Sequence, residues 1–286
     1  MSTGTSADTA EQDAERFDVP YVDLHAHMQF SDFDLNREEI ISNMRAQNVI
    51  AINVGTTYET SKKGVKLAQA HPDVFRATVG THPVHAVQGR AEESRASDFE
   101  DFFTNENTRE HVVGIGECGL DYFRREGDGV LTEDDLRVQE DIFQQQIDWS
   151  KKHGKPLMLH VRDSYGKTLE LLSKNFIPDK SQYRGNAHFF VGTVEEAQAF
   201  LDLGFSISFT GVITFVPAYR ALVEAVPLDR MFAETDSPYV SPVPFRGRKN
   251  NPVQVIEIYK KIAEIKGVPL RTVVETLHAN ARKYWL

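Results

Sequence analysis

Two histidines, His25 and His27, lie two residues apart at the end of a short apolar segment that begins at Tyr21. In a β-strand, residues i and i+2 point to the same face, so both imidazoles would project to one side. Two neutral imidazoles at this spacing can bind one divalent metal ion. One of them could instead be packed in the core and the other lie in a loop, so the pair alone does not establish a metal site.

Four more residues that can bind a metal close or follow other apolar segments, where a charged or imidazole side chain without a partner would be costly. They are Glu117, His160, His188 and Asp236. Four imidazoles and two carboxylates exceed the needs of one tetrahedral ion, so the set predicts two divalent ions about 3.5–4 Å apart. We expect Glu117 to bridge the two ions, and Asp236 to bind the first and to orient or deprotonate the attacking water.

These residues need elements that bring the strand ends together. Short β-branched runs alternate with longer segments of helical period, which predicts parallel strands that are each followed by a helix. Eight such runs favour a closed (β/α)8 TIM barrel, an α/β fold, over an open doubly wound sheet, and barrel active sites lie at the carboxyl ends of the strands. The predicted strands are Tyr21–His25, Val49–Val54, Phe75–Val79, Val112–Gly116, Leu157–Val161, Asn186–Phe190, Phe205–Phe209 and Met231–Thr235.

The intervening segments carry helix signals of their own. Thr132 and Thr193 are each followed three residues later by an acid, which predicts capping boxes. Two apolar faces, at 255–265 and 270–281, predict a closing pair of helices. No linker divides the chain, so we expect one domain over residues 20–286, preceded by a disordered acidic tail at residues 1–19.

Composition limits the location and the partners. The chain has 286 residues, and its single cysteine, Cys118, excludes an internal disulfide and suits a reducing compartment. No targeting segment and no run of about 18 apolar residues is present, so we expect a cytoplasmic protein without membrane contact, and a monomer. The formal net charge of −10 argues against broad attraction to nucleic acid. Residues 142–286 nevertheless carry nineteen Lys and Arg against fourteen Asp and Glu, which leaves room for a local phosphate site.

In order and spacing, these motifs resemble the TatD family of metal-dependent deoxyribonucleases, which belongs to the amidohydrolase-like group of barrels. The resemblance covers nearly the whole chain beyond residue 20. It implies that His25, His27, Glu117 and Asp236 hold one ion, that Glu117, His160 and His188 hold the other, and that nucleotides are removed from DNA 3′ ends. The motifs are Asp23-Leu24-His25-Ala26-His27, Gly80-Thr81-His82-Pro83, Gly116-Glu117-Cys118-Gly119-Leu120-Asp121-Tyr122, His160-Val161-Arg162, His188-Phe189-Phe190-Val191-Gly192, Glu234-Thr235-Asp236-Ser237-Pro238-Tyr239 and Arg246-Gly247-Arg248-Lys249-Asn250-Asn251-Pro252.

The sequence departs from the family pattern at two places. Met28-Gln29-Phe30 follows the histidine pair where members usually have one apolar residue and an acid, so the loop after the first strand should differ in shape. Cys118 replaces an aliphatic residue, and strand alternation predicts that it points away from Glu117 as a small buried side chain.

Several residues near the predicted strand ends could contact a substrate. The resemblance places His82 on the substrate side, where it could donate a hydrogen bond to a phosphate or bind a third ion. Nearby His85 could share that role, but as a loop residue it is expected to be solvated. Arg162 would either bind a phosphate oxygen or pair with Asp121 or Glu234. The remaining candidates are Tyr239 for base stacking, Phe245 for stacking or loop packing, and Arg246, Arg248 and Lys249 for the nucleic acid backbone.

The leading hypothesis is a metal-dependent deoxyribonuclease with 3′–5′ exonuclease activity on single-stranded ends, in which two ions activate a water and Asp236, Glu117 and His82 are catalytic. A mixed imidazole and carboxylate set suits Zn or Mn better than Mg, although Mg or Mn commonly supports the family. The alternative is an amide or ester hydrolase with the same metals, such as a D-aminoacyl-tRNA deacylase. A noncatalytic nucleic acid-binding barrel would not need six ligands.

Overall fold

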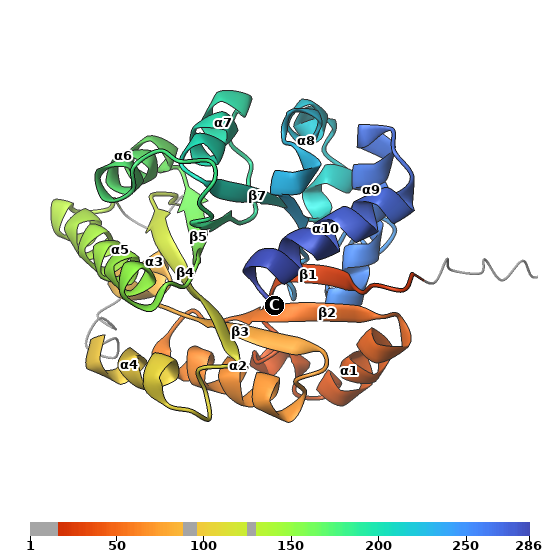
Figure 1. The fold of residues 1–286 in the computed structure, drawn as a ribbon, viewed down its shortest axis with the longest axis horizontal. Coiled ribbons are helices and arrows are strands. Elements are labelled where there is room, and N and C mark those ends of the chain that lie inside the picture. The colour runs from red at the N-terminus through yellow and green to blue at the C-terminus, as the bar shows by residue number, and fades with distance from the viewer. Residues whose placement is uncertain (1–16, 88–95, 125–129) are drawn as a thin grey trace, which may run out of the picture.

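The computed structural model describes residues 17–87, 96–124 and 130–286, and within these ranges eight parallel strands pair in the order β1 to β8. Helices surround the strands (Figure 1), as the sequence predicts for a single-domain (β/α)8 TIM barrel. The strands are β1 (Tyr21–Ala26), β2 (Val49–Val54), β3 (Phe75–Val79), β4 (Val112–Asp121), β5 (Leu157–Arg162), β6 (Gly185–Ala187), β7 (Phe205–Phe209) and β8 (Met231–Ala233).

The two ends of the sheet meet just beyond β8. The backbone N–H of Asp236 donates to the carbonyl of His25 at 2.9 Å, and that of His27 donates to Ser237 at 2.9 Å. Ala26 and Ser237 form the corresponding parallel bridge. The contacts that bring β1 and β8 together therefore also place the histidine pair beside Asp236.

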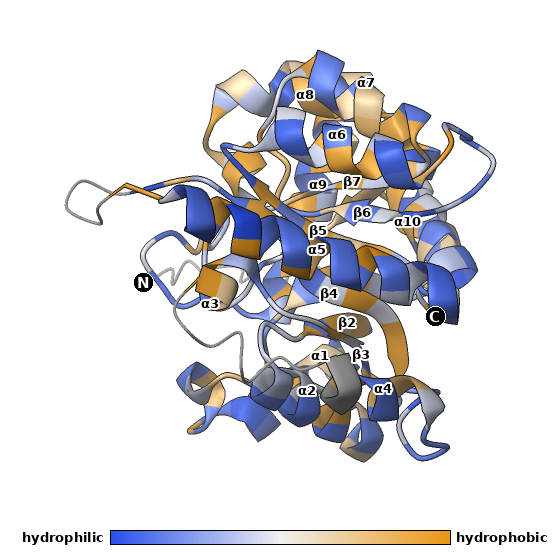
Figure 2. Cartoon of the chain, turned by 90° about the vertical axis from the view of Figure 1, so that its left-hand side faces the viewer, coloured by the Kyte–Doolittle hydropathy of each residue, from blue (hydrophilic) through white to orange (hydrophobic). Residues whose placement is uncertain are grey.

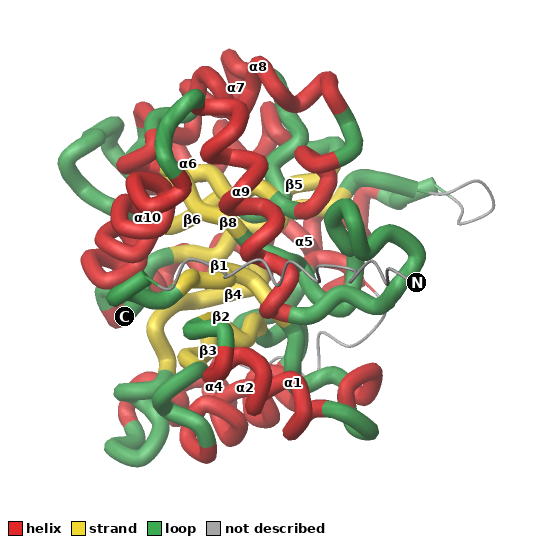
Figure 3. The backbone as a smooth tube through the Cα atoms, turned by 90° about the vertical axis from the view of Figure 1, so that its right-hand side faces the viewer, coloured by secondary structure: helices red, strands yellow, loops and turns green. Residues whose placement is uncertain are grey.

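Ten α-helices lie among the described residues and enclose the strands (Figure 3). They are α1 (Arg37–Ala46), α2 (Tyr58–Ala70), α3 (Pro83–Val87), α4 (Ala96–Thr104), α5 (Glu133–His153), α6 (Tyr165–Asn175), α7 (Val194–Asp202), α8 (Arg220–Ala225), α9 (Val255–Lys266) and α10 (Leu270–Tyr284). Short 3-10 turns complete the connections: η1 (Ser31–Phe33), η3 (Gly211–Thr214), η4 (Pro217–Tyr219), η5 (Leu228–Arg230) and η6 (Pro252–Gln254).

Both predicted capping boxes are confirmed. The Thr132 side chain accepts from the backbone N–H of Asp135 at the start of α5, and Thr193 accepts from Glu196 at the start of α7. The predicted closing pair is also confirmed, because α9 and α10 follow one another and pack together. Helix α5 turns mainly hydrophilic residues to the viewer in Figure 2, while residues such as Phe143 and Ile147 are buried.

The apolar core has two parts, an outer layer between strands and helices and a smaller inner cluster. The inner cluster joins residues of β1, β2, β5 and β8, which lie around the barrel, to Trp285 just after α10. Trp285 packs at Gly114, near the start of β4, where an added Cβ would come within 2.5 Å of the indole. Trp285 therefore closes the barrel at the amino ends of the strands, opposite the end that carries the metal-capable residues.

Some predicted boundaries were wrong. Strand β4 runs on to Asp121, so Glu117 lies inside the strand instead of following it, and β6 and β8 end before His188 and Glu234. Residues 1–16 of the predicted tail lie outside the described residues, whereas Phe17 is buried and packs edge-on against Tyr21. No helix in the described ranges is long and apolar enough to cross a membrane.

Candidate metal centre

The first group of candidate ligands lies at the carboxyl ends of β1 and β8, beside the part of β4 that carries Glu117. The Nε2 atoms of His25 and His27 face each other at 3.1 Å. Oε2 of Glu117 lies 3.5 Å from His25 Nε2 and 3.8 Å from His27 Nε2, and Oδ1 of Asp236 lies 3.7 and 3.5 Å from them. A tetrahedral ion with bonds of about 2.0–2.1 Å separates its ligand atoms by about 3.3–3.4 Å, so His25, His27 and Glu117 fit one divalent cation, and Asp236 lies at a similar distance from both histidines.

The second group contains the other oxygen of Glu117. Its Oε1 atom lies 2.9 Å from His160 Nδ1 and 2.9 Å from His188 Nε2, and these two nitrogens are 3.4 Å apart. The set can hold a second cation that keeps open positions for water or substrate. Glu117 thus presents one oxygen to each group, as a bridging carboxylate would. All six predicted ligands come together, and their role in metal binding remains a prediction.

A bulge in β4 aims Glu117 at both groups. The register between β4 and β5 shifts between Ile115 and Cys118, and a bulge re-aims the side chain that it carries. Gly116, with φ of 146°, precedes Glu117, and an added Cβ there would lie 2.5 Å from the carbonyl oxygen of Met158. Cys118 is buried in the outer core, as predicted.

Three of the four candidate histidines have an acceptor close to the second ring nitrogen, whereas Nδ1 of His25 has no hydrogen-bond partner among the described residues. His160 Nε2 lies 3.0 Å from Asp121 Oδ2, His188 Nδ1 lies 3.3 Å from Glu234 Oε1, and His27 Nδ1 donates to the Val54 carbonyl at 2.8 Å. Such partners fix the tautomer and orientation of a ligating imidazole. This position of Asp121 and Glu234 behind the histidines is not apparent from the sequence, although each lies within four residues of a predicted ligand.

The buried charges explain the pKa shifts. Burial alone would raise the pKa of the Glu117 carboxyl, but the surrounding imidazoles hold it well below its ordinary value. Burial lowers the pKa of His188, but Glu117 and Glu234 outweigh this and raise it well above its ordinary value. Burial and the His188 imidazole lower the pKa of His25. The centre therefore favours ionised carboxylates surrounded by positive charge, which divalent cations can supply.

His82 lies beside this centre with a defined tautomer. The backbone N–H of Val84 donates to His82 Nδ1 at 3.1 Å, so the neutral ring carries its proton on Nε2, 3.3 Å from Glu117 Oε1. Burial and the His160 imidazole lower the pKa of His82 to about 4, which keeps the ring neutral at neutral pH. His82 is therefore arranged as a hydrogen-bond donor, but it also forms a metal-capable group with Asp121 and His160, so the phosphate contact and the third ion both stay predictions.

A cavity of about 720 Å³ opens over the centre. Among the predicted substrate residues, His82, Arg162 and Tyr239 line it. His85 lines it too, and it lies half-buried in helix α3, so the expectation of a solvated loop residue was wrong. Arg162 stacks on the Phe123 ring, with Cζ 3.5 Å from its centre, and forms no ion pair with Asp121 or Glu234 within the described ranges. Its lining residues are His27, Phe30, Thr56, His82, Val84, His85, Glu117, Asp121, His160, Val161, Arg162, His188, Phe189, Val191, Val212, Tyr219, Asp236, Tyr239 and Val240.

The predicted basic loop lies outside this cavity. Arg246 stacks on Phe215, with Cζ 3.9 Å from the ring centre, and donates to the Ser241 carbonyl. Lys249 contacts the Asp32 carbonyl. Neither Arg248 nor the half-buried Phe245 is among the residues that line the cavity. The sequence shows that this loop follows β8, but it does not show that Arg246 and Lys249 contact neighbouring loops of the protein.

The loop after β1, where the sequence departs from the family pattern, contributes to the cavity wall. Met28 is buried, and the Gln29 amide donates to the Val54 carbonyl at 2.7 Å. The Phe30 ring then stacks on the His27 imidazole at 4.5 Å and lines the cavity. The extra residues thus place an aromatic wall against a candidate ligand.

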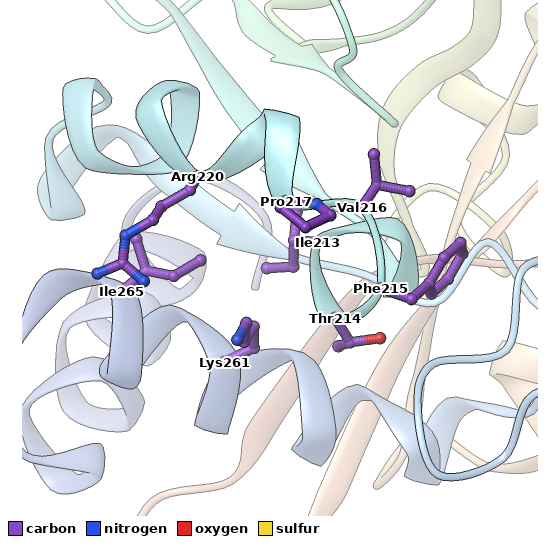
Figure 4. A pocket seen from close by; sticks show the side chains of 8 residues that line it. All are labelled: Ile213, Thr214, Phe215, Val216, Pro217, Arg220, Lys261 and Ile265. Carbon is purple, nitrogen blue, oxygen red and sulfur yellow. The ribbon is translucent and has the colours of Figure 1, made fainter.

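A second hollow of about 250 Å³ lies between the turns η3 and η4 and helix α9 (Figure 4). Arg220 and Lys261 border it, but each is already paired, with Glu224 at 2.8 Å and Glu264 at 2.7 Å. Its remaining lining is mostly apolar, as at Ile213 and Ile265. The hollow therefore offers no unpaired charge for a ligand.

Comparisons with known proteins agree with this architecture. The family model described as TatD related DNase matches residues 22–286. A crystal structure of a TatD homologue from Escherichia coli, YJJV, superposes with a TM-score of 0.78 at 24% identity, covering 92% of this chain and 97% of that one. A TatD family hydrolase from Entamoeba histolytica gives 0.77 at 20% identity, covering 93% and 98%. At these identities the two structures support the fold.

Relatives found by sequence comparison share more identical residues with this chain than the two solved structures do. The uncharacterized metal-dependent hydrolase YabD of Bacillus subtilis is 30% identical over 264 residues, which cover 91% of this chain and 97% of the relative. The uncharacterized metal-dependent hydrolase YcfH of Escherichia coli is 32% identical over 265 residues, covering 91% and 93%. The chain therefore belongs to the TatD family and is a metal-dependent hydrolase.

Proposed function

We propose that this hydrolase cleaves phosphodiester bonds in DNA and removes nucleotides from the 3′ ends of single strands. The observation that carries the proposal is the Glu117 carboxylate, whose two oxygens face separate groups of imidazoles at the floor of an open cavity. A pair of adjacent cations suits an in-line displacement at phosphorus, since the attacking and leaving oxygens both need stabilisation. The family description as a DNase supports the same chemistry.

Two divalent ions held here would lower the pKa of a bound water and offset the charge that develops on the phosphate. The protein supplies the remaining functions. Asp236 lines the cavity, and although burial would raise the pKa of its carboxyl, the hydrogen bond from His27 and the nearby imidazoles lower it. An ionised carboxylate at this position can accept or orient the proton of the attacking water.

Three other lining residues suit the substrate. Arg162 is the single Lys or Arg among the lining residues in the described part of the chain, and its guanidinium could bind a nonbridging phosphate oxygen. His82 directs its Nε2–H at the centre and could donate to another such oxygen. Tyr239, with 53% of its surface exposed, offers a ring on which an unpaired base could stack.

Arg246, Arg248 and Lys249 are exposed on the loop after β8. In this proposal they contact the backbone of the strand further from the scissile bond, while the cavity holds the end itself. The arrangement suits local capture of a strand end by a protein whose net charge is negative.

An amide or ester hydrolase is the second candidate, and the lining of the cavity favours it. Five valines line the cavity beside a single arginine, which suits an acyl group at least as well as a polyanion. An aminoacyl-tRNA ester would combine such a group with a nucleic acid. The two candidates predict different products from the same metal centre.

Purified protein should be incubated with single-stranded DNA labelled at either the 3′ or the 5′ end, with and without a chelator, beside an aminoacyl-tRNA ester. We expect stepwise loss from the 3′ end that the chelator abolishes. The Asp236→Asn variant should lose most of this activity, whereas Asp229→Asn, an exposed aspartate in η5, should keep it. Intact DNA together with a hydrolysed aminoacyl ester would overturn the nuclease proposal in favour of the second candidate.

A further inference from the structure

A row of polar side chains runs through the apolar interior of the barrel. Ser206 and Ser208 of β7 face inward, because the alternate residues Phe205, Ile207 and Phe209 belong to the outer core. Asn186 of β6 faces inward for the same reason, since its neighbour Ala187 is in the outer core. These three polar side chains are almost fully buried, so each needs hydrogen-bond partners.

The partners form a continuous hydrogen-bonded chain of side chains, which runs from Trp285 near the C-terminus to the candidate metal centre. Each link is a side-chain hydrogen bond of 2.6 to 2.9 Å. In order, Trp285 Nε1 meets the Tyr183 hydroxyl at 2.6 Å, Tyr183 meets Ser206 at 2.9 Å, Ser206 meets Asn186 Oδ1 at 2.7 Å, Asn186 Nδ2 meets Ser208 at 2.6 Å, and Ser208 meets Glu234 Oε2 at 2.6 Å.

The two ends fix the direction of every link. An indole N–H only donates and a carboxylate only accepts. The Tyr183 hydroxyl therefore accepts from Trp285 and donates onward to Ser206, and the Ser208 hydroxyl accepts from Asn186 and donates to Glu234. All the donors point toward Glu234.

Glu234 is fully buried, and within the described ranges no Lys or Arg pairs with it. Oε2 accepts from Ser208, and Oε1 accepts from the backbone N–H of Phe189 at 2.6 Å. The remaining neighbour of Oε1 is His188 Nδ1 at 3.3 Å, an ion-pair distance at which the ring N–H is not aligned for a hydrogen bond. A buried carboxylate is costly without such donors, so the chain supports a negative charge directly behind a candidate metal ligand.

We propose that Glu234 is a positioning residue that holds His188 as the Nδ1–H tautomer, and that the chain from Trp285 to Ser208 sets how well Glu234 does so. With the proton on Nδ1, the Nε2 atom keeps its lone pair, 2.9 Å from the Glu117 oxygen of the second group. A residue at the closed end of the barrel thereby tunes the affinity for the second ion. The inference rests on the two-ion centre of the proposed function but not on its substrate.

Proton transfer along the chain is excluded by its middle link. The Asn186 side chain accepts through oxygen and donates through nitrogen, and an amide does not pass a proton readily from one to the other. The chain therefore acts by orientation and polarisation, which strengthen successive hydrogen bonds in a low-dielectric interior.

Metal affinity tests the proposal without any DNA. The protein is titrated with Zn²⁺ against a chromogenic chelator, which resolves the two binding steps. We expect Glu234→Gln to weaken the second step about 10- to 100-fold, the usual cost of losing such an outer partner, and to leave the first nearly unchanged. Ser208→Ala should have a smaller effect on the same step, and Trp285→Phe the smallest.

Matched control variants distinguish the loss of these hydrogen bonds from a general loss of packing. Ser150→Ala removes the hydroxyl of another buried serine, which donates to the Lys155 carbonyl, and Trp149→Phe shrinks another buried indole. Both should bind two ions like the unaltered protein. The double variant Ser208→Ala/Trp285→Phe should be no weaker than Ser208→Ala alone, because the chain is already broken at Ser208.

The ¹⁵N chemical shifts of His188 give a second measurement, recorded in the metal-free protein at a pH above the raised pKa of this imidazole, where the ring is neutral. We expect the Nδ1–H tautomer to dominate in the unaltered protein and a mixture of tautomers in Ser208→Ala. Unchanged second-ion affinity in both Ser208→Ala and Trp285→Phe would overturn the proposal even if Glu234→Gln does not fold. Loss of DNA cleavage with these affinity shifts intact would instead count against the proposed substrate alone.

Discussion

At Glu117, one carboxylate oxygen lies 3.5 Å from His25 Nε2 and the other lies 2.9 Å from His188 Nε2. No other carboxylate among the described residues places one oxygen in each of the two ligand groups. Asp236 reaches only the first group, and Asp121 reaches His160 only from the side away from Glu117. Removing these three carboxylates should therefore have different consequences for the two ions.

Glu117→Ala should lower the metal content at both positions, because each ion loses a charged ligand. The content is measured by elemental analysis after gel filtration. Asp121→Asn is the matched comparison, since it removes only the acceptor behind His160 and should weaken one ion. Two ions retained at full occupancy in Glu117→Ala would show that Glu117 does not bridge.

The imidazole pKa values predict that metal uptake releases protons. Burial lowers the pKa of His27, His160 and His188, but neighbouring carboxylates outweigh it, and all three are raised above 6.5. In the metal-free protein these groups add stability that is fully present below pH 6.5 and is lost as the pH rises through the raised values. Ions must displace the same protons.

Adding Zn²⁺ to weakly buffered metal-free protein near pH 6.5 should therefore release protons, and the number released should fall as the pH is raised. A pH indicator measures the release directly. Uptake of two ions without any proton release near pH 6.5 would contradict the assignment of these imidazoles as ligands.

Among the elements, strand β4 does most to shape the centre. Its bulge lets Glu117 and Asp121 both reach the cavity, while Cys118 between them stays in the outer core. Gly116 permits this geometry because its φ of 146° is unfavourable for other residues and because the Met158 carbonyl leaves no room for a Cβ.

Gly116→Ala should lower the free energy of unfolding by more than about 1 kcal/mol and also reduce metal binding, since the bulge must shift. Gly154→Ala is the control: φ is 62° at the end of α5, and nothing lies within 4 Å of an added Cβ. It should cost about 1–2 kcal/mol without changing metal content. Chemical denaturation and elemental analysis measure the two effects. Normal metal content in a folded Gly116→Ala protein would refute this role of the bulge.

The sequence predicted the elements better than their details. Apolar runs predicted all eight strands, because the β-branched pattern of a parallel sheet is local. The predicted strand ends also pointed to the six candidate ligands, whose role in metal binding stays a prediction. The bulge at Gly116 and the links from Asp121 to His160 and from Glu234 to His188 depend on neighbouring strands, which no local pattern reports. Likewise, the charge of Arg246 was visible, but its stacking on Phe215 was not.

For the whole molecule, the net charge of −10 and the positions of the cations have to be considered together. One arginine lines the cavity, and three more cations lie exposed on the loop after β8. For the proposed nuclease, this distribution predicts local capture of a strand end and not extended coating of a duplex. The barrel is closed below the centre by Trp285, so substrate and ions reach the centre from the cavity side.

Anomalous diffraction from crystals grown with Zn²⁺ or Mn²⁺ would locate the ions themselves. We predict two peaks about 3.5–4 Å apart on either side of the Glu117 carboxylate. His25 and His27 should bind the first ion, and His160 and His188 the second. A single peak, or a second ion held by His82 and Asp121 in place of His188, would contradict the two-ion centre described here.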